Sequence, residues 1–216
     1  MNDRIILASG SPQRADIMRE LGIKFDVVSV DVAEVTLETA AETVTANAKL
    51  KAIAAWQKLA GGNLAIAADT VLSIDGHILG KPGSEQRARE YLLSISGHDV
   101  TAVSAVASVC GGMDNGWIGI ETATARVKTL TEAEVDWYVA HGEPLTRAGA
   151  IGISRYGELF ITSVHGAYSC FAGLPKRTLL AVIGRMPANV LSGFVPAVGL
   201  PPIDDVRVES FAVEQL

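Results

Sequence analysis

The chain has 216 residues and a net charge of 18 − 24 = −6, from 18 Lys and Arg against 24 Asp and Glu. Its length suits one large domain, and its 49% hydrophobic content excludes a disordered chain, although no apolar run approaches the roughly 20 residues of a membrane helix. The acidic balance disfavours a broad grip on DNA or RNA, so we expect neither a nucleic acid polymer nor a membrane as partner.

The amino-terminal half alternates apolar runs with helical patterns. Residues 1–4 lead into an apolar run without the profile of a signal peptide, so we expect a cytoplasmic location. Apolar runs bounded by turn residues predict strands at residues 4–8, 25–30, 64–68, 71–74 and 77–79. The last two form a hairpin, because Asp75-Gly76 suits a tight two-residue turn. Helices are predicted from Pro12 to Gly22, with Ser11 as the cap, and at residues 38–59 and 84–96.

The carboxyl-terminal half predicts strands at residues 100–110, 117–128 and 159–164 and a last helix at residues 174–185. Thr131 and Glu134 have the spacing of a capping box, which predicts a helix start. Because hairpins and buried strands interleave with helices, the fold class is α/β with a mixed sheet. We expect one domain at residues 1–185 and a C-terminal extension or arm at residues 186–216, where four of the eight prolines lie.

A candidate anion site lies where the first strand gives way to the first helix, at residues 9–14. Free backbone N–H groups and the positive end of the helix meet there. Arg14 lies in the first helical turn, where a cation opposes the helix dipole, which suggests that it meets a bound anion. The alternative is that Ser11 is only a helix cap and Arg14 is solvated, and these residues alone do not separate the two interpretations.

Two carboxylates and three cations suggest phosphate chemistry. Asp69 follows the run at residues 64–68 immediately, at a strand end where ligands of α/β sheets bind, and Glu34 ends the second strand. Each residue alone is ordinary, since such carboxylates often form turns and lysines are usually solvated. As a set, Glu34 and Asp69 could hold a divalent cation while Arg14, Lys51 and Lys81 neutralise phosphates.

Five ordered motifs resemble those of the Maf family of nucleoside triphosphate pyrophosphatases, over about residues 4–185. They are residues 7–14, Ala68-Asp69-Thr70, Gly80-Lys81-Pro82, Glu143-Pro144-Leu145 with Ala148-Gly149-Ala150, and Gly173-Leu174-Pro175. The resemblance implies a homodimer with an elongated mixed β-sheet flanked by helices and two lobes around a cleft, similar to inosine triphosphate pyrophosphatases. It also implies hydrolysis between the α and β phosphates with a divalent metal cation, Mg or Mn.

The resemblance assigns roles to individual residues. Asp69 matches the catalytic carboxylate, which acts as general base or holds the metal, and Glu34 matches its partner in metal binding. The matches to substrate-binding residues are Ser9, Arg14, Lys51, Lys81 and Ser154. The Lys51 match needs a one-residue gap near Leu37, and Lys49 is the alternative.

Two positions depart from the family pattern. Gln13 stands where the family often has Arg, and Ser154 stands where Gln marks the dTTP and UTP branch and Glu marks the 7-methyl-GTP branch. Residues 68–70 resemble the dTTP and UTP branch, which favours dTTP or UTP as the substrate. Modified nucleotides are the other expected substrates. The alternatives are a 7-methyl-GTP-type pyrophosphatase and a nucleotide-binding regulatory protein with little turnover.

Overall fold

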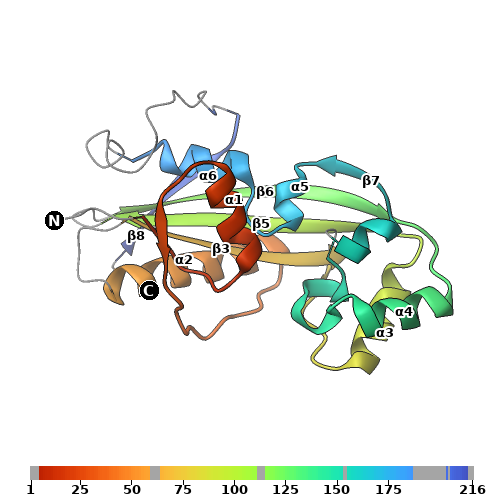
Figure 1. Ribbon diagram of the computed structural model, residues 1–216. Helices are drawn as coiled ribbons and strands as arrows, with labels where there is room; N and C mark the ends of the chain where they lie inside the picture. The colour runs from red at the N-terminus through yellow and green to blue at the C-terminus, as the bar shows by residue number, and fades with distance from the viewer. Residues whose placement is uncertain are drawn as a thin grey trace.

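A mixed β-sheet runs the length of the molecule, with helices on both of its faces (Figure 1). The structure is a computed structural model that describes residues 5–58, 64–110, 115–152, 155–186, 203 and 205–213. Its strands are β1 Ile5–Leu7, β2 Phe25–Val27, β3 Leu64–Ile74, β4 His77–Leu79, β5 Asp99–Cys110, β6 Asn115–Val127, β7 Ile161–Gly166 and β8 Val208–Ala212. The order is β2-β1-β3-β5-β6-β7, with β4 beside β3 and β8 beside β6. Because β1 pairs in parallel with β2 and β3 and the other pairs are antiparallel, the predicted mixed sheet is confirmed.

The α-helices of the described residues agree in place with those predicted, with ends shifted by one or two residues. They are α1 Pro12–Glu20, α2 Ala40–Lys58, α3 Glu85–Ile95, α4 Glu132–His141, α5 Tyr168–Phe171 and α6 Lys176–Ile183. The short α5 was not predicted. The described residues also form the 3₁₀ turns η1 Pro144–Thr146, η2 Ala148–Ala150 and η3 Arg155–Phe160. The predicted capping box of Thr131 and Glu134 is confirmed at the start of α4. None of the described helices has the length and apolar character that spanning a bilayer requires.

Alternation along β3 divides the first lobe into two layers. Leu64, Ile66 and Ala68 pack with α1 and α6, whereas Ala65 and Ala67 point to the opposite face and pack with α2. The alanines of α2 that meet this face are fully buried, so small side chains on both elements let the helix lie close to the sheet. Side chains of β3 at odd positions therefore face α2.

A second lobe forms around the far ends of β3, β5 and β6. Residues of these strands pack with α3, α4 and η2 in a separate cluster that includes Leu92, Val100 and Tyr138. Figure 1 shows α3 and α4 at one end of the long strands and α2 and α6 at the other. The two lobes therefore share one sheet, and its long strands fix them to each other.

Two predicted strand ends are wrong. Strand β3 does not end before Asp69, because it pairs with β5 without interruption from Leu64 to Ser73 and so takes in the hairpin strand predicted at residues 71–74. Strand β2 ends at Val27, which leaves Glu34 in the loop before α2. In the predicted C-terminal arm, β8 pairs with β6, and residues 187–202 lie outside the described residues.

Both cysteines are buried, and neither forms a disulfide bond among the described residues. Burial and the nearby charge of Glu121 raise the pKa of Cys170 to about 12. At pH 8 about one Cys170 thiol in 10⁴ would be ionised, and only the thiolate reacts quickly. We expect neither Cys110 nor Cys170 in the native protein to react with a thiol reagent at pH 8, and both to react in denaturant. Rapid modification of the native chain would contradict this.

Candidate functional site

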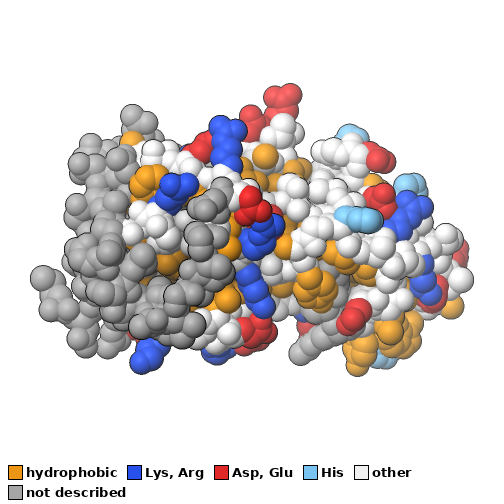
Figure 2. All heavy atoms as spheres, turned by 90° about the horizontal axis from the view of Figure 1, so that it is seen from above, with side chains coloured by type: hydrophobic (Ala, Val, Ile, Leu, Met, Phe, Trp, Pro, Cys, Tyr) orange, Lys and Arg blue, Asp and Glu red, His pale blue; other side chains and the backbone are white. Residues whose placement is uncertain are grey.

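A pocket of about 930 Å³ lies where the two lobes meet. Its walls come from the β1–α1 loop, the loop after β2, α2 and β3 on one side, and from the segment after β4, η1, η2 and α5 on the other. Seen from above, Lys and Arg side chains form a row across the middle of the molecule, with acidic side chains beside them (Figure 2). The volume is of the size that binds small molecules, and the charged lining favours a polar ligand.

The β1–α1 loop is held by Ser9 rather than by Ser11. Ser11 occupies the N-cap position before Pro12, yet its side chain makes no capping hydrogen bond, so that part of the prediction is wrong. The backbone N–H of Ser11 instead donates to Oγ of Ser9 over 3.2 Å. Residues 9–13 all line the pocket. The loop and the N-terminus of α1 therefore form one wall of the pocket.

Arg14 connects three parts of the chain. Its Nε donates to the carbonyl of Gly173 at 2.8 Å, and its Nη1 donates to the carbonyl of Ala68 at 2.7 Å and to Oγ of Ser9 at 3.2 Å. Burial lowers the pKa of the Arg14 guanidinium, against the opposing effect of the Asp69 and Glu34 charges. The alternative of a merely solvated Arg14 is wrong. Its contact with an anion stays a prediction.

Lys51 lies between two carboxylates. Its Nζ is 2.6 Å from Oδ1 of Asp69 and 2.7 Å from Oε1 of Glu34, and its side chain is 12% exposed. The alternative, Lys49, places its ammonium over the ring of Phe211, 5.0 Å from the centroid. The structure thus brings Lys51, not Lys49, to the carboxylates.

Opposite charges hold Glu34 in the ionised form. Burial alone would raise its pKa, but the hydrogen bond and charge of Lys51, with the more distant Lys81 and Arg14, lower it below the ordinary value. The Glu34 side chain is 59% exposed, so one carboxylate oxygen can meet solvent or ligand while Oε1 faces Lys51. The three cations that were predicted to neutralise phosphates therefore also stabilise the negative charge of Glu34.

Asp69 faces α2 from the middle of β3, and its side chain is 9% exposed. Its Oδ1 accepts from Lys51, and its Oδ2 accepts from Nδ2 of Asn47 at 3.3 Å. A carboxylate has about four lone-pair positions, so two acceptor positions remain for a water, a metal or a substrate group. The side chain combines a fixed orientation with spare acceptor capacity.

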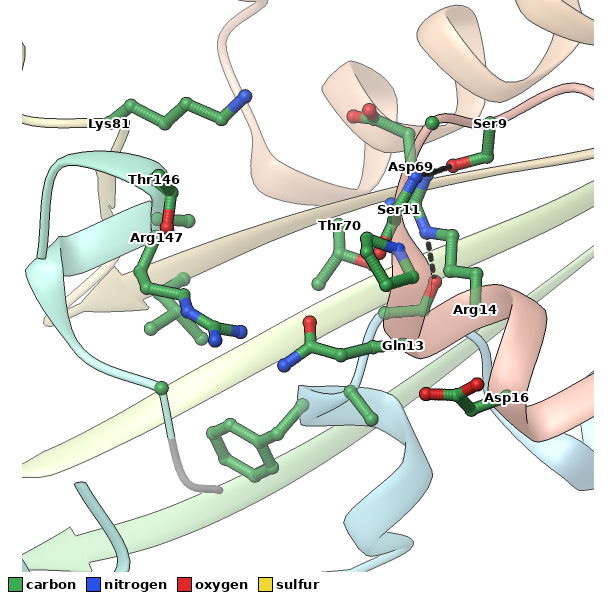
Figure 3. Close-up of a pocket in the computed structure, with 18 of the residues that line it drawn as sticks. Ser9, Ser11, Gln13, Arg14, Asp16, Asp69, Thr70, Lys81, Thr146 and Arg147 are labelled. Atoms are coloured by element: carbon green, nitrogen blue, oxygen red, sulfur yellow. Dashed lines mark hydrogen bonds between the residues drawn. The ribbon is translucent and has the colours of Figure 1, made fainter. Parts of the chain in front are cut away.

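Lys81 approaches from the other lobe. It follows β4, is exposed, and lies across the pocket from Ser9 and Asp69 with its ammonium directed into the cavity (Figure 3). The backbone beside it is fixed, because the N–H of Gly149 donates to the carbonyl of Gly80 at 3.0 Å. Lys81 can therefore reach a ligand that Asp69 and Lys51 contact from the opposite wall.

Sequence reasoning missed Asn47 and Arg147. Asn47 is buried on α2 one turn before Lys51, and a polar side chain on the inward face of an alanine-rich helix was the signal. Arg147 joins η1 to η2 and lines the pocket with its guanidinium 3.6 Å from Glu143 (Figure 3). Its position directly before Ala148 in a motif was the signal. Ser154 lies outside the described residues.

The charges that line the pocket balance among the described residues. Four basic and four acidic side chains give 4 − 4 = 0, and they are Arg14, Lys51, Lys81 and Arg147 with Asp16, Glu34, Asp69 and Glu143. Among the described residues, no group of three or more His, Cys, Asp and Glu side chains is arranged so that it could hold a metal ion. Two carboxylates suffice for a magnesium ion whose other ligands are water and phosphate oxygens, so the donors Glu34 and Asp69 fit such an ion.

Comparison with known proteins identifies related chains. The family model described as Maf-like protein matches residues 4–186. The dTTP/UTP pyrophosphatase of Dictyoglomus thermophilum is 34% identical over 197 residues, which are 88% of this chain and 100% of the relative. That of Methylococcus capsulatus is 36% identical over 198 residues, 89% and 97% of the two chains. The solved structure of the Staphylococcus aureus Ham1 protein is 20% identical and covers 57% of this chain and 71% of its own, with a TM-score of 0.41, a likeness too slight to support an argument.

Proposed function

The chain belongs to the Maf family, and on that premise we propose that it hydrolyses a nucleoside triphosphate to the monophosphate and pyrophosphate. The observation that carries the proposal is the contact of Lys51 with both Glu34 and Asp69 at the wall of a charged pocket. Relatives named dTTP/UTP pyrophosphatase, which match most of this chain, support the same reaction.

Asp69 is the catalytic carboxylate in this proposal. One of its free acceptor positions takes the proton of the water that attacks the α-phosphorus, while Lys51 and Asn47 keep its two oxygens in place. Lys81 and Arg14 bind the phosphates, and Lys81 stabilises charge that develops on the departing pyrophosphate from the opposite wall. The bond broken is the one between the α-phosphorus and the bridging oxygen, so nucleoside monophosphate and pyrophosphate leave.

The proposal includes a divalent cation, Mg or Mn, because the basic and acidic side chains that line the pocket already neutralise one another. A triphosphate adds several negative charges to a pocket whose charged side chains sum to zero. Glu34 and Asp69 would hold the ion, which when bound polarises phosphate oxygens and offsets their charge. We expect activity to be lost with a chelator and restored by Mg²⁺ or Mn²⁺.

The substrate class is tested by a panel of nucleotides with separate detection of pyrophosphate and orthophosphate. We expect pyrophosphate as product, with dTTP or UTP among the better substrates. A preference for 7-methyl-GTP would place the chain in the other branch. Tight binding of triphosphates without turnover would favour the regulatory protein, for which the neutral Gln13 at the pocket wall is the supporting observation.

Lys81→Ala should weaken nucleotide binding without weakening the fold. The side chain is exposed and belongs to none of the three buried clusters, while a charge-assisted contact to phosphate contributes about 1.5–3 kcal/mol. We expect KM to rise about 10- to 100-fold with an unchanged melting temperature. Lys24→Ala, which removes an exposed lysine outside the pocket, is the control. Equal KM and equal kcat values for the two variants would show that Lys81 is only solvated.

Two other expectations remain predictions. One is a homodimer, which light scattering of the purified protein tests directly. The other is a cytoplasmic location, which suits an enzyme acting on the nucleotide pool and which cell fractionation tests.

A further inference from the structure

Asn47 connects the two carboxylates of the site through its side-chain amide. Its Oδ1 accepts from the backbone N–H of Val35 at 2.9 Å, and its Nδ2 donates to the carbonyl of Val35 at 3.0 Å. The same Nδ2 donates to Oδ2 of Asp69 at 3.3 Å. Both amide hydrogens and the carbonyl oxygen are therefore used, and the side chain is 3% exposed.

These contacts place Asn47 between two segments that the chain supplies separately. Val35 follows Glu34 directly in the loop before α2, whereas Asp69 lies in β3. Lys51, one helical turn after Asn47 on α2, holds Oδ1 of Asp69 and Oε1 of Glu34. Each oxygen of Asp69 thus has its own donor on α2, and the Glu34 loop has its own anchor.

We infer that Asn47 is a positioning residue that fixes the orientation of Asp69 and the distance between Asp69 and Glu34, and this inference rests on the proposed function of those carboxylates. Without the amide, Lys51 is the remaining hydrogen-bond donor to the Asp69 carboxylate among the described residues, and the carboxylate can rotate about this contact. The Glu34 loop also loses the two hydrogen bonds between the backbone of Val35 and the Asn47 side chain. A misplacement of about 1 Å in a catalytic group is enough to reduce turnover strongly.

The chain offers a matched control on the same helix and loop. Thr43 is buried on α2 one turn before Asn47, and its Oγ1 accepts from the backbone N–H of Leu37 at 2.9 Å. It anchors the same loop, but the hydrogen bonds of its hydroxyl go to Leu37 and Thr39 and do not include Asp69. Thr43→Val therefore removes a similar anchor of the loop and leaves the hydrogen bonds of Asp69 intact.

The experiment compares Asn47→Leu, Asn47→Asp and Thr43→Val with the parent chain. Steady-state kinetics give kcat and KM, and amide hydrogen exchange followed by NMR reports the N–H groups of Val35 and Leu37. For Asn47→Leu we expect kcat to fall at least about tenfold, with KM changed less than kcat and Val35 deprotected. For Thr43→Val we expect Leu37 deprotected and kcat within about twofold of the parent.

Asn47→Asp keeps one of the contacts with Val35 and removes the donor to Asp69. Its carboxylate still accepts from the N–H of Val35, but it no longer donates to the Val35 carbonyl and it places a like charge beside Asp69. We expect the N–H of Val35 to stay protected while kcat falls. It also keeps the inference testable if Asn47→Leu does not fold. Parental kcat in Asn47→Asp, or equal kcat in Asn47→Leu and Thr43→Val, would overturn the positioning role. A parent chain that hydrolyses no triphosphate would instead overturn the proposed function, and the inference with it.

Discussion

Asp69→Asn should reduce turnover by at least about 10²-fold while the protein stays folded. The substitution keeps the size of the side chain and removes the charge that would accept a proton or bind a metal ion. Strand β3 is paired with β5 without interruption from Leu64 to Ser73, so the backbone around residue 69 does not depend on the carboxylate. Pyrophosphate release gives the rate, and circular dichroism with a melting curve reports the fold.

Asp75→Asn is the control for this prediction. Asp75 is exposed in the turn between β3 and β4, outside the pocket, and undergoes the same chemical change. We expect its turnover to stay within about twofold of the parent. If Asp69→Asn kept the activity of Asp75→Asn, the catalytic assignment of Asp69 would be wrong.

Arg14→Ala should lower the free energy of unfolding by about 3 kcal/mol. The substitution leaves the carbonyls of Ala68 and Gly173 without their charged donor, and charge-assisted hydrogen bonds contribute about 1.5–3 kcal/mol each. As a predicted anion contact alone, Arg14 would affect nucleotide binding more than stability. The contacts of Arg14 with the protein add a large effect on stability. Urea unfolding measures it.

Arg19→Ala on the same helix is the control for Arg14→Ala. Arg19 is 63% exposed, pairs with Asp16 at 2.6 Å, and lies with its guanidinium 5.8 Å from the Phe25 ring centroid. Exposed contacts of this kind contribute below about 1 kcal/mol. Similar losses of stability in the two variants would show that the hydrogen bonds of Arg14 do not stabilise the fold.

Local patterns predicted those parts of the fold that depend on neighbours in the sequence. The capping box at Thr131 and the hairpin turn at Asp75-Gly76 are made by residues within a few positions of one another. The strand end before Asp69 was predicted wrongly because a polar side chain after five apolar residues is typical of the end of a buried strand. The partner that continues the strand, β5, is supplied about 35 residues later.

The candidate site depends on contacts that no local pattern contains. Arg14 donates to the carbonyls of residues 68 and 173, and Lys51 meets a carboxylate 18 residues away. The types of residue at the site could therefore be predicted from the sequence, with help from family resemblance, but their pairing could not. Asn47 was missed for the same reason, since its role exists only where the loop, the helix and the strand meet.

The unbroken pairing of β3 with β5 constrains how this chain can vary in length. Side chains alternate between the two faces of a strand. Asp69 reaches α2 because it lies two and four residues after Ala67 and Ala65, on the same face of β3. Deleting or inserting one residue between Leu64 and Asp69 would turn the carboxylate to the face that α1 and α6 cover, or force a bulge into a ladder of ten consecutive pairs. Related chains should therefore show no insertion or deletion within the six residues from Leu64 to Asp69.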